Sequence, residues 1–164
     1  MADPVWVIDT SSLIAIKSLP HADRDRVFAR LSVRVKGARL FFPREVLNEL
    51  KRDSSDKRSP DRPCVWALEV EGDACQHAPT LEEVKAVLAI VPDILDPAKD
   101  SGADEADPYV LALAKKLRDQ GVDARVVTEE AKNYLRKLSL NTACGMLGIP
   151  SLPLLGLLRS EGIS

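Results

Sequence analysis

The chain has 164 residues and a formal net charge of −2, with 45% hydrophobic and 29% charged residues. These values are ordinary for a globular protein and predict a single domain over residues 1–164. The near-neutral charge excludes a generally basic nucleic-acid-binding surface. The three cysteines are irregularly spaced, which disfavours both a disulfide framework and a zinc site.

The amino-terminal residues carry neither a basic segment nor a long apolar segment, so we expect no secretory signal. Apolar stretches fall far short of the roughly 20 residues that span a bilayer. Unpaired cysteines are typical of reducing compartments. These features together predict a cytoplasmic protein with no membrane partner.

The first half of the chain opens with a strand. Residues 5–8 read Val-Trp-Val-Ile, a continuous apolar run that predicts a strand covered on both faces. It turns directly into a helix after Asp9. Apolar residues at helical spacing predict a second helix that Gly37 ends, and residues 40–42 predict a second strand. A further helix begins near Pro43.

The middle of the chain is mostly polar or helical. Residues 51–63 are charged and rich in turn formers, which predicts an exposed loop. A short helix is expected over residues 65–70. Thr80 and Glu83 form a capping box that begins the next helix.

The second half resumes the alternation of strands and helices. Asp107 before a proline predicts a helix N-cap. We expect a strand over residues 125–128, a basic helix after Glu130, a short strand over 149–152 and a closing helix over 154–158. The alternation predicts an α/β fold, a three-layer sandwich in which helices flank a small, mainly parallel sheet.

Four acids stand near one edge of the predicted sheet. Asp9 and Glu130 follow strands, Glu49 lies on the helix after a strand, and Asp107 begins a helix. Each alone has an ordinary explanation as a cap or a solvated acid. Converging carboxylates repel one another unless protons or a cation intervene. Oxygen ligands of this kind favour Mg²⁺ or Mn²⁺ over zinc.

The same acids lie in motifs that resemble those of PIN domains. Residues 7–14 read Val-Ile-Asp-Thr-Ser-Ser-Leu-Ile, and residues 43–50 end in a Glu-Leu pair on a helix. Residues 106–114 place an Asp at the start of an Ala-rich helix, and residues 126–130 read Val-Val-Thr-Glu-Glu. The order and spacing agree along nearly the whole chain.

The resemblance implies a PIN-like fold and the VapC-like class of toxin endoribonucleases. It further implies an RNA substrate, an antitoxin protein as partner and a homodimer. The tail over residues 138–158 is similar to a less-characterised branch of PIN-like proteins. The segment between Glu49 and Asp107 is longer than in the shortest members.

The four acids are the predicted catalytic and metal-binding residues. We expect Asp9 and Asp107 to be the main ligands of Mg²⁺ or Mn²⁺. Glu49 and Glu130 are expected to bind the ion directly or through ordered water, because Mg²⁺ keeps several waters.

Four other residues complete the predicted site. Ser11 and Thr128 are expected to hydrogen-bond to the carboxylates or to substrate phosphate. Glu129 and Asp104 are the less favoured acids. The family commonly has Asp at the fourth position, and Glu130 keeps the Thr-x-acid spacing that Glu129 does not.

Basic groups are expected to contact RNA around the acids. The candidates are Lys51-Arg52, Lys57-Arg58, Lys115-Lys116-Arg118 and Lys132-Arg136-Lys137. Two other functions remain open. One is an aspartyl phosphotransfer domain, although Ser11 stands where a phosphatase of this kind has a second Asp. The other is a catalytically weak PIN-like interaction module.

Overall fold

The fold is built on a small parallel sheet. The computed structural model describes residues 2–54, 60–96, 105–133 and 137–163. The sheet has four parallel strands in the order β2-β1-β3-β4. The strands are β1 (Val5–Ile8), β2 (Leu40–Phe41), β3 (Ala124–Val127) and β4 (Ser151–Leu152). The predicted α/β class is therefore confirmed, and the described sheet is wholly parallel.

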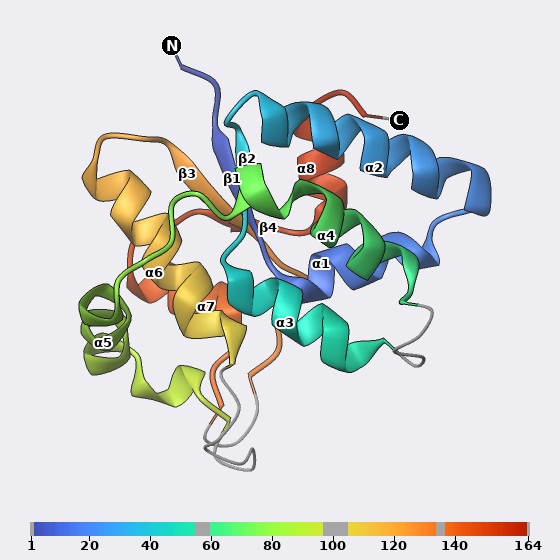
Figure 1. Ribbon diagram of the computed structural model, residues 1–164. Coiled ribbons are helices and arrows are strands. Elements are labelled where there is room, and N and C mark those ends of the chain that lie inside the picture. The colour runs from blue at the N-terminus through green and yellow to red at the C-terminus, as the bar shows by residue number, and fades with distance from the viewer. Residues whose placement is uncertain (1, 55–59, 97–104, 134–136, 164) are drawn as a thin grey trace.

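Helices cover both faces of this sheet, which makes three layers (Figure 1). Helices α2 and α8 lie to one side of the strands in that view, and α5, α6 and α7 lie to the other. The helices are α1 (Thr10–Ala15), α2 (His21–Lys36), α3 (Arg44–Asp53), α4 (Arg62–Ala74), α5 (Leu81–Ile90), α6 (Ala106–Asp119), α7 (Leu140–Met146) and α8 (Leu154–Ser160). Two short 3₁₀ helices, η1 (Ile16–Ser18) and η2 (Pro92–Ile94), join them.

Strand β1 lies in the interior because its apolar run leaves no polar side chain to face water. Trp6, Val7 and Ile8 are fully buried. Its register against β3 pairs Ile8 with Val127. The residues that follow each strand, Asp9 and Thr128, therefore emerge side by side at the carboxyl edge of the sheet.

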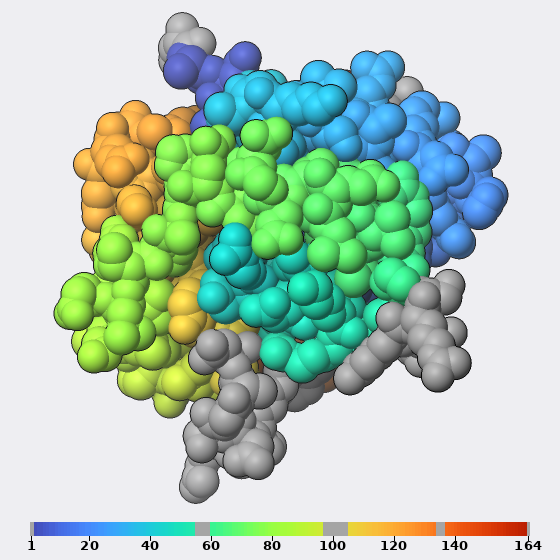
Figure 2. Space-filling model, in the orientation of Figure 1, coloured from blue at the N-terminus to red at the C-terminus, as the bar shows by residue number. Residues whose placement is uncertain are grey.

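The helices close over the sheet with aliphatic side chains. Side chains of α3, α4 and α5 hide most of the sheet from the side shown in Figure 2. Helix α6 supplies the most continuous inner stripe, including Val110, Leu113 and Leu117. Thr80 and Glu83 form the predicted capping box at the start of α5. The buried residues join into one hydrophobic cluster.

Three sequence predictions are corrected by the structure. Asp107 is not an N-cap, because α6 begins at Ala106 and the N-cap is Glu105. The predicted basic helix after Glu130 is absent at the described positions, since residues 131–133 and 137 are not helical. The predicted loop over residues 51–63 is shorter than expected, because α3 and α4 extend into it.

The other sequence predictions concern the cysteines, membrane-spanning helices and residues that the structure does not describe. All three cysteines are free. Across the described parts of the chain, every helix is too short or too polar to cross a bilayer. Asp104, Lys57-Arg58 and Arg136 lie outside the described residues.

Candidate metal centre

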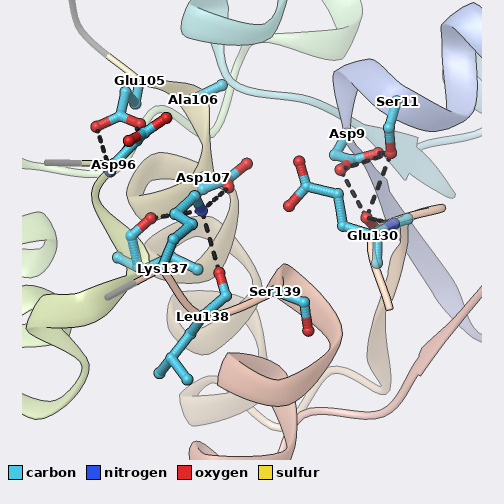
Figure 3. Close-up of polar contacts among 12 residues, drawn as sticks. Asp9, Ser11, Asp96, Glu105, Ala106, Asp107, Glu130, Lys137, Leu138 and Ser139 are labelled. Atoms are coloured by element: carbon cyan, nitrogen blue, oxygen red, sulfur yellow. Dashed lines mark hydrogen bonds and ion pairs between the residues drawn. The ribbon is translucent and has the colours of Figure 1, made fainter. Parts of the chain in front are cut away.

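Three of the four predicted acids meet at the carboxyl edge of the sheet. Asp9, Asp107 and Glu130 each offer a carboxylate oxygen, and these oxygens lie within 4.8 Å of one another. The three side chains come from the end of β1, the first turn of α6 and the segment after β3. In Figure 3 the carboxylate of Glu130 points into the space between Asp9 and Asp107.

Asp9 is held by the elements on either side of it. It is the N-cap of α1, where its Oδ1 accepts a hydrogen bond of 3.1 Å from the backbone N–H of Ser12. The hydroxyl of Ser11 donates to Oδ1 at 2.8 Å, and the hydroxyl of Thr128 donates to Oδ2 at 2.7 Å. These bonds fix the carboxylate orientation before any ligand arrives.

The protonation of the cluster is perturbed by burial. Asp9 is only 2% exposed, and burial raises its pKa to about 8, with the nearby Asp107 adding to the rise. Burial and Asp107 also raise the pKa of Glu130 to about 7. Asp9 therefore holds its proton at neutral pH, and Glu130 is about half-protonated there, unless a cation takes the place of the protons.

The donor set fits a hard divalent cation. All three side chains offer carboxylate oxygens, which are the ligands that Mg²⁺ and Mn²⁺ prefer. Cys144 is buried, and burial raises the pKa of its thiol to about 12, but its sulfur is not among the ligand atoms that lie within 4.8 Å of one another. A structural carboxylate as buried as Asp9 would ordinarily have a fixed cation beside it.

The described residues place one cation in direct contact with the cluster. The ammonium of Lys137 lies 3.1 Å from Oδ2 of Asp107, and the two side chains are 18% and 14% exposed. The sequence placed Lys137 in a basic patch for RNA and gave no sign of this ion pair.

The two adjacent glutamates after β3 have different roles. Glu130 enters the acidic cluster, and its backbone N–H donates to Oγ1 of Thr128 at 3.0 Å. The Oε1 atom of Glu129 instead accepts from the backbone N–H of Leu154 at 2.7 Å, at the start of α8. Glu129 thus accepts a hydrogen bond from the first turn of α8, and Glu130 is the acid that belongs to the cluster.

Glu49 lies beside the cluster and joins two elements. Its carboxylate accepts from the hydroxyl of Thr10 and, at 3.3 Å, from the backbone N–H of Ala106. It thereby satisfies one of the open N–H groups at the start of α6, the helix that carries Asp107. The structure assigns Glu49 a positioning contact that its sequence context did not reveal.

Two cavities flank the cluster and share Ser11 and Glu130. One of about 440 Å³ is lined by Lys132 and Lys137. The other, of about 420 Å³, is lined by Glu49 and Arg52. The basic group on α6 lies elsewhere, since Lys115 pairs with Asp119 and Lys116 with Glu83.

One sequence family accounts for nearly the whole chain. The profile described as "Domain of unknown function (DUF4411)" matches residues 6–164. The chain belongs to this family. A search of curated proteins found no match to the chain. The acids of the centre all fall inside the DUF4411 region.

The raised pKa values predict an unusual pH dependence of stability in EDTA. The unfolded chain ionises Asp9 and Glu130 near their ordinary values of 3.8 and 4.5, while the folded chain keeps the protons until about pH 8 and 7. The folded state thus binds more protons across this window. The free energy of unfolding should fall between pH 5 and pH 8, by up to about 6 kcal/mol when both carboxyls contribute in full.

Urea unfolding at pH 5, 6.5 and 8 measures this fall. Asp123 and Glu161 have lowered pKa values, so their contribution is constant above pH 5. Asp9→Asn should flatten the profile, as should a saturating divalent cation. A free energy of unfolding that rises or stays level from pH 5 to pH 8 in EDTA would contradict the prediction.

Proposed function

We propose that this DUF4411 chain is a Mg²⁺- or Mn²⁺-dependent endoribonuclease with a PIN-like fold. The observation that carries the proposal is the convergence of Asp9, Asp107 and Glu130 at the carboxyl edge of a parallel sheet. Ligands of open parallel α/β sheets bind at this edge. The sequence motifs around these acids resemble those of PIN domains, which adds support.

Asp9, Asp107 and Glu130 are the residues that would hold the ion, and Glu49 lines a cavity that Glu130 also lines. A bound divalent cation supplies two things to phosphodiester hydrolysis: an activated water and charge stabilisation on the phosphate. The protein orients the ligands. Ser11 and Thr128 hold the carboxylate of Asp9 in place.

The flanking cavities support an RNA strand that passes across the centre. Both are lined by Ser11 and Glu130, and one is also lined by Arg52 and the other by Lys132. Basic side chains at such positions contact the phosphates before and after the cleaved bond. An RNA that continues in both directions is cut internally, which is endonuclease activity.

The geometry around Asp9 argues against an aspartyl phosphotransfer domain. A nucleophilic carboxylate needs an accessible oxygen. Asp9 is 2% exposed, and its two oxygens already accept hydrogen bonds from Ser11, Ser12 and Thr128. These hydrogen bonds hold the carboxylate of Asp9 in one orientation beside Asp107 and Glu130.

The proposed function also includes a toxin of the VapC-like class. By its resemblance to VapC-like proteins, we assign the chain to the cytoplasm, with an antitoxin protein that blocks the acidic edge and with a second copy of the chain as a homodimer. The open edge around Glu130 offers the surface that such an antitoxin would cover.

Cleavage of RNA with and without divalent cations tests the function. The purified chain is incubated with a mixed RNA pool and with a circular RNA, in Mg²⁺, in Mn²⁺ and in EDTA. We expect fragments from both substrates with either metal and none in EDTA. Cleavage of the circle shows that the bond cut is internal. Intact RNA under all three conditions, from a chain that unfolds cooperatively, would contradict the proposal.

A further inference from the structure

Lys137 is bound more firmly than a surface lysine that only pairs with an acid. Its Nζ donates to the backbone carbonyl of Ile94 at 2.6 Å, to that of Leu138 at 3.1 Å and to Oδ2 of Asp107 at 3.1 Å (Figure 3). An ammonium has three N–H donors, and each has an acceptor here. The side chain is 18% exposed.

The position of this ammonium is set by the backbone. The carbonyl of Ile94 ends η2, and that of Leu138 lies in the segment before α7. The backbone N–H of Leu138 donates to the carbonyl of Asp93 at 2.8 Å, which ties the two segments together. Two of the three acceptors would therefore hold the ammonium in place even without Asp107.

We propose that Lys137 is a fixed internal cation of the acidic centre, which restricts it to one divalent ion and holds one oxygen of Asp107. This rests on the proposed metal-dependent function. When the three carboxylates of the centre are ionised, one ammonium leaves two formal negative charges, which one divalent ion neutralises. Lys137 is thus a positioning residue that acts through Asp107.

The same contacts make Lys137 a poor candidate for RNA binding. All its donors are used inside the protein, so none is left for a phosphate oxygen. Lys132 lines the same cavity and is exposed.

Titration with Mn²⁺, by calorimetry and by the Mn²⁺ paramagnetic resonance signal, tests the inference without an activity assay. The wild-type chain should bind one ion. Lys137→Met removes the charge but keeps an unbranched side chain, and it should bind Mn²⁺ about tenfold tighter, because a nearby positive charge no longer repels the ion. Lys137→Arg should bind as the wild type does.

Lys115→Met is the matched control. It removes the same charge from the far end of α6, where Lys115 pairs with Asp119, and should leave Mn²⁺ binding unchanged. Thermal unfolding of each variant shows that it is folded.

The outcomes separate the two proposals. Equal or weaker Mn²⁺ binding by Lys137→Met would overturn the role of Lys137 alone, as would two ions on the wild-type chain. The second result needs no variant, so it decides the question even where Lys137→Met does not fold. Absence of Mn²⁺ binding in every folded variant would overturn the metal centre as well.

Discussion

Asp9→Asn should lower the rate of metal-dependent RNA cleavage by at least about 100-fold. The substitution removes the charge of a central ligand but keeps the shape of the side chain. An amide oxygen can still accept from the N–H of Ser12 and cap α1. The thermal midpoint of the metal-free protein should therefore stay within a few degrees of the wild type or rise, because the most deeply buried carboxyl of the centre no longer has to be ionised.

Two measurements separate a catalytic defect from a folding defect. Cleavage rates are taken at saturating Mg²⁺, and thermal unfolding is followed in EDTA. Asp119→Asn is the control, since Asp119 is exposed at the far end of α6. This variant should cleave RNA at the wild-type rate. Wild-type cleavage by Asp9→Asn would remove Asp9 from the site.

Glu161→Ala should destabilise the fold by about 3 kcal/mol and lower the thermal midpoint by roughly 6–12 °C. The side chain of Glu161 is 6% exposed and lies between two arginines, 2.9 Å from Nε of Arg34 and 2.7 Å from Nη2 of Arg39. It also accepts from Nε1 of Trp6 at 3.1 Å. Truncation leaves these three donors facing a gap.

Urea unfolding measures this loss, and Glu71→Ala serves as the control. Glu71 pairs with Arg44, whose side chain is 64% exposed, so its loss should cost less than about 0.5 kcal/mol. Glu161 contacts Trp6 in β1, Arg34 in α2 and Arg39 just before β2, and none of the acids of the centre. RNA cleavage below the unfolding temperature should therefore be unaffected. Equal free energies of unfolding for Glu161→Ala and Glu71→Ala would show that the contacts of Glu161 stabilise the fold no more than an exposed ion pair does.

Much of the fold was predictable because local signals and tertiary structure agree. Residues 5–8 are apolar without interruption, which favours a strand that is buried on both faces of a parallel sheet. Thr80 and Glu83 satisfy each other's backbone within one turn. The start of α6 was predicted wrongly, because two acids near it, Glu105 and Asp107, could each serve as the N-cap. Asp107 before a proline has the pattern of an N-cap, which predicts a helix that begins at Pro108, yet the helix begins two residues earlier, at Ala106.

The acids of the site were predictable for a topological reason, whereas their partners were not. Asp9 and Glu130 follow strands, and parallel strands end at one edge. The choice of Glu130 over Glu129 came from the spacing after Thr128. The contact between Lys137 and Ile94 spans 43 residues and uses a backbone carbonyl, which carries no sequence signal. No periodicity reports such a bond.

The central place of β1 has a consequence for the order in which the protein is made. The hydroxyl of Thr128 that holds Asp9 is 119 residues further along the chain, and β3, the neighbour of β1, is synthesised after α6. A nascent chain that ends before β3 has one edge of its innermost strand open and lacks Glu130. The acidic centre is therefore incomplete until β3, Thr128 and Glu130 have been synthesised.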